Sequence, residues 1–405
     1  MHEAIRPALY YPWVYTRGGA ERTILELMTR SRHDWTLYTN RFEAEATFPV
    51  FRSLKVTTLK EISVRRNIRS VGSAALTLLT QALDLSKHDA LFVVTEGLGN
   101  LVALRSNIPT SCICLTPLKV AYDEVTRENF YRGRLRLHYR LAIGFYCRFE
   151  RPIWRRYHRV LCNSQEVRRR VIAAGLAEDD RVEVVHHGVD IDRFVPGHRR
   201  DQFFLVPGRI MWQKNIDLAL SAWRLFKPSP SDNDLRLVIA GMVDQKSRPH
   251  LARLRAAAAD RSDVEFVESP SDEALIDLYQ RCIGVVVPAQ NEDWGLVPLE
   301  AMSCGKPVIA VNRGGPTETV VHGETGYLLP DRPHDFAAAI SHLACTSEDE
   351  LEALAIRARA RASTFTWTRF VNRVDAHADE MAFQRQPGLV AGNDMHDVVS
   401  ALSQG

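Results

Sequence analysis

Short apolar runs alternate with amphipathic stretches along most of the chain. A short apolar run bounded by turn residues is typical of a buried strand, whereas apolar residues three and four positions apart predict a helix. The runs read as strands lie at 8–11, 35–38, 55–59, 90–94, 111–115, 159–162, 182–190, 203–206, 235–240, 264–267, 283–287, 307–311 and 326–329. Strands that alternate with helices call for parallel sheets covered on both faces, so the sequence predicts an α/β protein.

The length of the chain predicts more than one domain. At 405 residues it exceeds one ordinary hydrophobic core, and two domains fit the usual size range. The most convincing linker is Val195-Pro-Gly-His-Arg-Arg. We therefore expect domains at 1–195 and 196–365, a helix at 366–383, and a tail at 384–405 without a strong pattern.

Composition and charge indicate the cellular compartment of the protein and the partners that it lacks. The net charge of +3 is too small to indicate a nucleic-acid partner. The first residues lack the apolar core of a signal peptide, and no apolar run approaches the roughly 18 residues that span a bilayer. Seven scattered cysteines are typical of a reducing compartment. We expect a cytoplasmic protein, with Cys112 and Cys114 packed in the core.

Two glutamates eight residues apart are the strongest candidates for a site. Glu292 follows the apolar run at 283–287, and Glu300 lies in the helix that we expect to begin near Gly295 or Leu296. Open α/β sheets bind ligands at the carboxyl ends of their strands, and a helix start attracts anions. Because carboxylates suit hydroxyl groups and the helix start suits phosphate, the pattern predicts a nucleotide-sugar site.

Two cations follow the first strand of the second half. Gly208-Arg209 and Lys214 straddle a turn into a helix, so both side chains can converge on one diphosphate. Arginine binds two oxygens with its planar fork, and lysine adds a mobile charge. Cations aimed at a departing diphosphate stabilise the charge that develops there.

These motifs resemble those of the retaining GT-B glycosyltransferases of family 4. The segment from Glu292 to Glu300 resembles the family's E-x7-E signature, and Gly208 to Lys214 resembles its G-R-x(4)-K element. The resemblance implies a GT-B fold: two doubly wound Rossmann-like domains, an interdomain cleft, and a last helix that crosses back to the first domain. It implies hexose transfer from a nucleoside diphosphate sugar to an acceptor hydroxyl in glycan, polysaccharide or glycolipid assembly, without a metal or other cofactor.

The resemblance also implies roles for particular residues. Arg209 and Lys214 would neutralise the diphosphate, Glu292 would meet the donor sugar, and Glu300 would hold the ribose. The other donor-binding residues carried over are Gly18, Gly19, Gly208, Trp294, Gly295, Leu296 and Val297. No protein nucleophile or separate base stands out, which fits a front-side mechanism in which the leaving phosphate takes the acceptor's proton. The sequence around Gly314 is similar to mannosyltransferases, so GDP-mannose is the preferred donor.

Leu115 departs from the family pattern. It stands where related sequences carry the histidine of His-Thr-Pro, which helps to orient the sugar. The alternative function is therefore a partner or sensor subunit that binds a nucleotide sugar without transferring it.

An arginine-rich segment has several possible interpretations. Residues 127–170 hold 13 arginines, three glutamates and no lysine or aspartate, with interleaved aromatic and leucine residues. Such a surface could rest on anionic lipid headgroups and reach a lipid-linked acceptor. The alternatives are a solvated face, an internal salt-bridge network, or a surface that binds polyanions.

Overall fold

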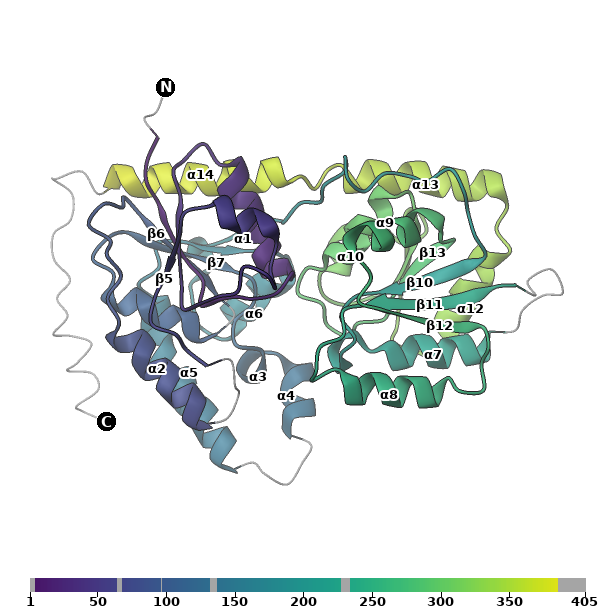
Figure 1. The fold of residues 1–405 in the computed structure, drawn as a ribbon, viewed down its shortest axis with the longest axis horizontal. Helices are drawn as coiled ribbons and strands as arrows, with labels where there is room; N and C mark the ends of the chain where they lie inside the picture. The colour runs from purple at the N-terminus through teal and green to yellow at the C-terminus, as the bar shows by residue number, and fades with distance from the viewer. Residues whose placement is uncertain (1–3, 64–67, 96, 132–136, 227–233, 385–405) are drawn as a thin grey trace. The chain divides into compact units, whose positions relative to one another are not determined.

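The structure is a computed structural model that describes residues 4–63, 68–95, 97–131, 137–226 and 234–384. The chain forms two compact units (Figure 1). The first comprises Met1–His186 with Thr368–Gly405, and the second comprises His187–Trp367. The tail expected beyond residue 384 lies outside the described residues.

The first unit contains a seven-stranded parallel sheet in the order β5-β3-β1-β6-β7-β8-β9. Its strands are β1 (Ala8–Tyr10), β3 (Thr36–Thr39), β5 (Val56–Thr58), β6 (Leu91–Thr95), β7 (Thr110–Cys114), β8 (Val160–Cys162) and β9 (Val182–Val184). Its helices are α1 (Gly19–Arg30), α2 (Ile68–Thr80), α3 (Lys119–Tyr122), α4 (Glu124–Tyr131), α5 (Leu137–Trp154), α6 (Gln165–Ala173) and α14 (Trp367–Gln384), which begins at the last residue of the second unit. A small pair of strands, β2 (Trp13–Val14) and β4 (Arg41–Phe42), was not expected because each has only two residues.

The second unit contains a six-stranded parallel sheet in the order β12-β11-β10-β13-β14-β15. Its strands are β10 (Phe203–Pro207), β11 (Arg236–Gly241), β12 (Val264–Glu268), β13 (Gly284–Val287), β14 (Val308–Val311) and β15 (Gly326–Leu329). Its helices are α7 (Ile216–Leu225), α8 (Arg248–Ala257), α9 (Asp272–Arg281), α10 (Leu296–Ser303), α11 (Pro316–Thr319), α12 (Pro333–Ala344) and α13 (Glu348–Ala362).

Both faces of the second sheet are covered by helices, as its apolar strands require. Along β10, Phe203 and Leu205 pack in one hydrophobic cluster with α10, while Phe204 and Val206 pack in another with α7 and α12. Side chains that alternate between two buried faces explain why the strand is apolar at every position.

The second unit begins earlier than the expected linker. Val189 donates its backbone N–H to Phe365 O at 3.1 Å and forms a bridge with Thr366. Gly188 lies so close to this segment that a Cβ there would meet Trp367 N at 2.0 Å. Because these contacts tie residues from 187 onward to the end of α13, residues 195–200 lie within the second unit.

Helix α14 is fixed to the first unit by polar contacts, some of them buried. Asp375 is 2% exposed and accepts a hydrogen bond from Ser31 Oγ at 2.5 Å. The Arg373 guanidinium pairs with Glu183 of β9, donating from Nη2 to Oε2 at 2.7 Å. His377 Nε2 lies 3.0 Å from the same Glu183 oxygen. These contacts join a helix and a strand that are far apart in the sequence.

The pair between Arg373 and Glu183 predicts a pH-dependent stability. Hydrogen bonds from Arg373, helped by His377, lower the pKa of Glu183 although partial burial opposes this. Its stabilising contribution is therefore present above the ordinary glutamate pKa of about 4.3 and is lost as the pH falls through the lower folded value. We expect Glu183→Gln to lower the melting temperature at pH 7 and the difference from wild type to shrink as the pH falls below about 4.3.

The control is Glu178→Gln, because Glu178 is exposed in the same unit and forms no ion pair with another described residue. This variant should melt with the wild type at every pH. A Glu183→Gln deficit that stays constant down to pH 3 would contradict the linkage.

Candidate functional site

The candidate site lies at the carboxyl edge of the second sheet. It is a pocket between the loops that follow two neighbouring strands, β10 and β13. The lining residues are Val206, Pro207, Gly208, Lys214, Ile216, Val287, Pro288, Ala289, Glu292, Gly295, Val297 and Pro298. Parallel strands bring such loops to one edge of a sheet, which is why residues far apart in the sequence meet here.

Lys214 and Glu292 form an ion pair inside this pocket. Lys214 Nζ donates to Glu292 Oε2 at 2.6 Å, and the two side chains are 26% and 22% exposed. The pocket encloses about 10 Å³, which is the space of roughly one water molecule. The two paired side chains lie in the lining of this small space.

Backbone conformations that favour glycine set the position of Lys214. Gly208 has φ +128°, and its N–H donates to Ala240 O of β11 at 3.0 Å. A Cβ on Gly241 would lie only 1.6 Å from Gly208 O, so two loops cross at close range. Asn215, directly after Lys214, is left-handed with φ +50° and precedes α7.

Three other glycines hold the Glu292 loop. Gly315 donates its N–H to Glu292 O at 2.9 Å, and Gly314 forms a bridge with Glu292. A Cβ on Gly315 would meet Trp294 O at 2.0 Å. Gly295 has φ +84° and lies directly before α10. The Gly314-Gly315 pair thus supports the loop, a role that the sequence motif alone does not reveal.

Glu300 lies within α10 rather than among the pocket-lining residues. Tyr279 of α9 donates its hydroxyl to Glu300 Oε2 at 2.8 Å. Burial foremost, and the Glu300 carboxylate next to it, raise the pKa of Tyr279, so the phenol remains a donor. The sequence did not indicate this partner of Glu300, because the contact depends on how α9 packs against α10.

Of the remaining candidate residues of the second unit, one lines the pocket, one is exposed to solvent and one lies in the core. Arg209 is exposed beside Gly208 and does not line the pocket. Trp294 is 3% exposed and packs edge-on against Phe365 at 5.4 Å, so its side chain belongs to the core. Leu296 and Val297 begin α10, and only Val297 lines the pocket.

Gly18 and Gly19 belong to the first unit, at the start of α1. Gly18 is extended with φ −98°, and a Cβ on Gly19 would have nothing within 4 Å. Neither glycine is therefore required by the local backbone.

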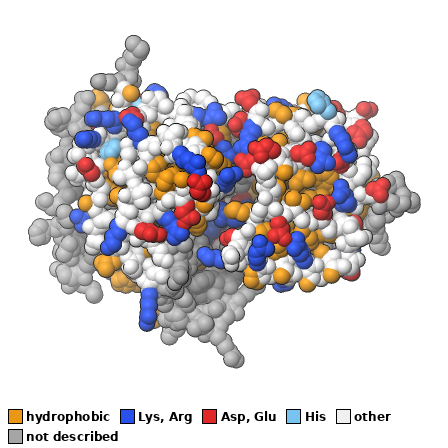
Figure 2. All heavy atoms as spheres, viewed as in Figure 1, with side chains coloured by type: hydrophobic (Ala, Val, Ile, Leu, Met, Phe, Trp, Pro, Cys, Tyr) orange, Lys and Arg blue, Asp and Glu red, His pale blue; other side chains and the backbone are white. Residues whose placement is uncertain are grey.

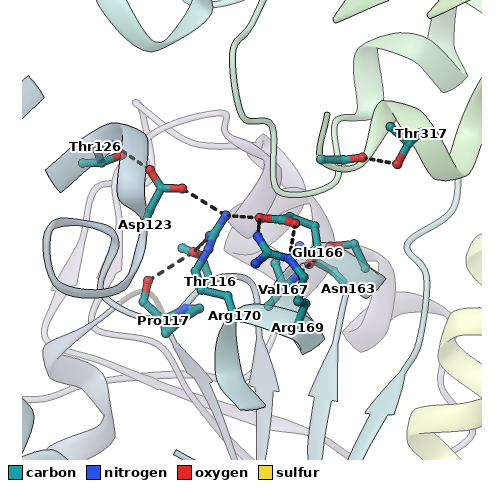
Figure 3. Close-up of polar contacts among 12 residues, drawn as sticks. Thr116, Pro117, Asp123, Thr126, Asn163, Glu166, Val167, Arg169, Arg170 and Thr317 are labelled. Atoms are coloured by element: carbon teal, nitrogen blue, oxygen red, sulfur yellow. Dashed lines mark hydrogen bonds and ion pairs between the residues drawn. The ribbon is translucent and has the colours of Figure 1, made fainter. Parts of the chain in front are cut away.

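The first unit carries a buried ion network of Asp123, Glu166 and Arg170 (Figure 3). Arg170 is 3% exposed and lies between Asp123 at 3.2 Å and Glu166 at 3.1 Å. It also donates to Thr116 Oγ1 at 2.9 Å. Burial acts to raise the pKa of Asp123, but hydrogen bonds from Thr126 and the charge of Arg170 outweigh it and lower the pKa. Leu115 is buried, and its carbonyl accepts a hydrogen bond from Asn163 Nδ2 at 3.1 Å.

The end of the arginine-rich segment is neutralised within the chain. Arg168 pairs with Asp179 and Arg169 with Glu166, in addition to the buried Arg170. On the face drawn in Figure 2, basic and acidic side chains are interspersed. For Arg168 to Arg170, the salt-bridge interpretation of the segment is therefore correct. The part of the segment at 132–136 lies outside the described residues.

The described residues contain neither a metal cluster nor a membrane-spanning helix. Within these ranges, no three His, Cys, Asp or Glu side chains group closely enough to hold a metal ion. Across the same part of the chain, no helix combines the length and apolarity that a membrane crossing requires.

Both units match known protein families. Residues 189–361 match the family described as Glycosyl transferases group 1, and residues 17–193 match the one described as Glycosyltransferase Family 4. Each match covers less than half of the chain, and together they indicate the class of group 1 glycosyltransferases.

Two relatives illustrate the sequence similarity. The D-inositol 3-phosphate glycosyltransferase of Rhodococcus jostii is 31% identical over 224 residues, which cover 52% of this chain and 49% of the relative. The enzyme of the same name from Kribbella flavida is 34% identical over 230 residues, covering 52% and 53%. The chain spans about half the length of these curated relatives.

Solved structures confirm the fold class. Sucrose-phosphate synthase from Thermosynechococcus elongatus superposes with a TM-score of 0.73 at 19% identity, covering 93% of this chain and 98% of the other. Anabaena Alr3699/HepE in complex with UDP-glucose gives 0.70 at 18% identity, covering 93% and 100%. The prediction of a GT-B fold with two doubly wound Rossmann-like domains is confirmed.

The close approach at Gly315 predicts a strict requirement for glycine. In Gly315→Ala the new methyl group would meet the Trp294 carbonyl, and such overpacking costs about 1–3 kcal/mol. We expect a lower melting temperature in thermal unfolding. Gly72→Ala is the control, because a Cβ at this helical position meets nothing within 4 Å, and it should leave the melting temperature unchanged or raise it. Equal melting of the two variants would contradict the packing argument.

Proposed function

We propose that this chain is a retaining glycosyltransferase that moves a hexose from a nucleoside diphosphate sugar to an acceptor hydroxyl. The observation that carries the proposal is the meeting of Lys214 and Glu292 in one pocket at the carboxyl edge of the second sheet. A cation suits the departing diphosphate, and a carboxylate suits the hydroxyl groups of a sugar. Both family matches support this chemistry.

In this proposal, donor binding breaks the Lys214–Glu292 ion pair, and the two side chains then bind different parts of the donor. Lys214 exchanges the Glu292 carboxylate for a diphosphate oxygen, and Arg209 moves in from solvent to add a second positive charge. Glu292 then accepts hydrogen bonds from the donor sugar. Backbone N–H groups at the start of α10 contribute to diphosphate binding, since a helix start favours anions.

The same helix supplies the group proposed to bind the ribose. Glu300 accepts hydrogen bonds from the ribose hydroxyls while Tyr279 holds one of its oxygens. The bond between the anomeric carbon and the diphosphate oxygen breaks, and the acceptor oxygen bonds to that carbon on the same face. The leaving phosphate takes the acceptor's proton, so the step needs no protein base and no metal.

The donor and the acceptor are proposed at the level of chemical class. GDP-mannose stays a prediction from the motif sequence, whereas HepE was solved with UDP-glucose. The relatives are named for D-inositol 3-phosphate. A donor panel of GDP-mannose, UDP-glucose and ADP-glucose, tested with this inositol phosphate and with a lipid-linked saccharide, covers these possibilities.

The alternative function is binding of a nucleotide sugar without transfer. It is motivated by Leu115, which is 6% exposed and holds Asn163 through its carbonyl. A donor that raises the melting temperature but is neither transferred nor hydrolysed, by wild type or by Arg209→Ala, would favour this alternative.

Replacement of Lys214 should slow transfer strongly. Loss of one preorganised group at a developing charge typically reduces turnover about 100- to 1,000-fold, and we expect this loss of kcat in Lys214→Ala. Product formation from the preferred donor provides the measurement. Lys246→Ala, which removes an exposed lysine of the same unit, should retain wild-type activity. Transfer by Lys214→Ala at the wild-type rate would exclude the proposed role.

We also propose a peripheral contact between the first unit and an anionic membrane. Leu141 and Phe145 of α5 are 65% and 75% exposed, and Arg140 and Arg148 beside them are also exposed. We expect the protein to sediment with vesicles that contain phosphatidylglycerol more than with neutral vesicles, and Phe145→Ser to weaken this binding. Equal sedimentation with both kinds of vesicle would count against the contact.

A further inference from the structure

A second cavity lies at the opposite edge of the second sheet from the Lys214–Glu292 pocket. It encloses about 340 Å³ and is lined by residues 196–200, the turn after α10, and α13. Arg200 precedes β10 and Lys306 precedes β14, so both lie at the amino ends of parallel strands. Lys214 and Glu292 follow strands at the carboxyl edge. The two sites are therefore separate.

The size and surroundings of the second cavity suit a small molecule. Its volume lies within the range of about 300–1,000 Å³ that is usual for such sites. Cys304 and Lys306 are buried, whereas Glu352 and Ile356 of α13 lie nearer the surface, so the lining runs from the interior to solvent. A ligand can thus enter from solvent and reach the buried residues.

Lys306 is a buried cation that lines this cavity without an anionic partner. It is 5% exposed, and the structure gives its ammonium no hydrogen bond and no carboxylate within 4.0 Å among the described residues. The nearby thiols of Cys282 and Cys304 supply no negative charge, since burial raises the pKa of each to about 12. Burial also lowers the pKa of Lys306, which reflects the cost of keeping this charge inside the protein.

Two arginines add to the positive charge of the cavity lining. Arg200 pairs through Nη1 with Glu348, but its Nε is buried and has no hydrogen-bond acceptor. Arg359 donates to the carbonyl oxygens of Ile191, Phe194 and Ser303, none of which carries a full charge. Glu352 is the acidic residue among the lining residues, against three basic ones.

Helix capping accounts for part of this arrangement but not for Lys306. Cations near a helix carboxyl end are stabilised by the helix dipole, and Arg359 serves α10 in this way by donating to Ser303 O. The backbone N–H of Lys306 likewise donates to Ala301 O at 2.9 Å. The Lys306 ammonium caps no carbonyl of the described residues, so its burial against a cavity points to a ligand.

We propose that this cavity binds a phosphoryl group, with Lys306 and Arg200 as its charged ligands. A phosphate dianion supplies several acceptor oxygens, which match the three donors of the ammonium and the positive charge of the arginine. The volume leaves room for the organic part of a small phosphate ester. Free phosphate and a phosphorylated metabolite share this chemistry, and their relative affinities distinguish them.

The test is calorimetric titration of the full chain with inorganic phosphate and, separately, with glucose 6-phosphate, at pH 7.5 and constant ionic strength. We expect binding that weakens at least tenfold in Lys306→Met. Tighter binding of the ester identifies a phosphorylated metabolite as the ligand, and equal affinities identify free phosphate. Wild-type protein that binds neither compound would overturn the proposal.

Three variants distinguish phosphate binding in this cavity from binding elsewhere on the chain. Lys214→Ala should retain phosphate binding, because Lys214 lies in the other pocket. If Lys214→Ala loses phosphate binding while Lys306→Met keeps it, the assignment to this cavity is refuted. Glu352→Gln should tighten binding by removing a negative charge, and weaker binding would count against the proposal. Should Lys306→Met fail to fold, Arg200→Met provides the same test of lost affinity.

Discussion

The carboxyl edge of the second sheet gathers the groups on which the proposed chemistry depends. Lys214 and Glu292 are 78 residues apart in sequence, yet they contact each other because β10 and β13 are parallel neighbours. Each side chain is about a quarter exposed, and an ion pair of this kind stabilises a fold by about 1 kcal/mol or less. The pair is therefore weak enough for a ligand to replace it, while the glycine-rich loops keep both groups in place.

Much of the fold could be predicted from the sequence, because apolar runs and turn residues are local signals. The run at 283–287 became β13, and the helix expected near Leu296 begins there as α10. The meeting of Lys214 with Glu292 could also be expected, since both follow strands of one parallel sheet. Their contact depends on the order of the strands in the sheet as well as on the two motifs.

Contacts that depend on packing between elements could not be predicted in this way. The hydrogen bond from Tyr279 to Glu300 joins two helices, and nothing in either helix alone indicates it. For the segment that contains Arg170, an internal salt-bridge network was one of several predictions, but the sequence could not identify Asp123 and Glu166 as the partners of Arg170. The crossing of Gly241 over Gly208 is likewise visible only in three dimensions.

Helix α10 is short, and its two ends lie beside the two proposed sites at the opposite edges of the sheet. Its eight residues span about 12 Å at 1.5 Å per residue. Val297 at one end lines the Lys214–Glu292 pocket, and the turn that holds Lys306 leaves the other end. A ligand held at Lys214 and one held at Lys306 would therefore lie at opposite ends of the same two-turn helix.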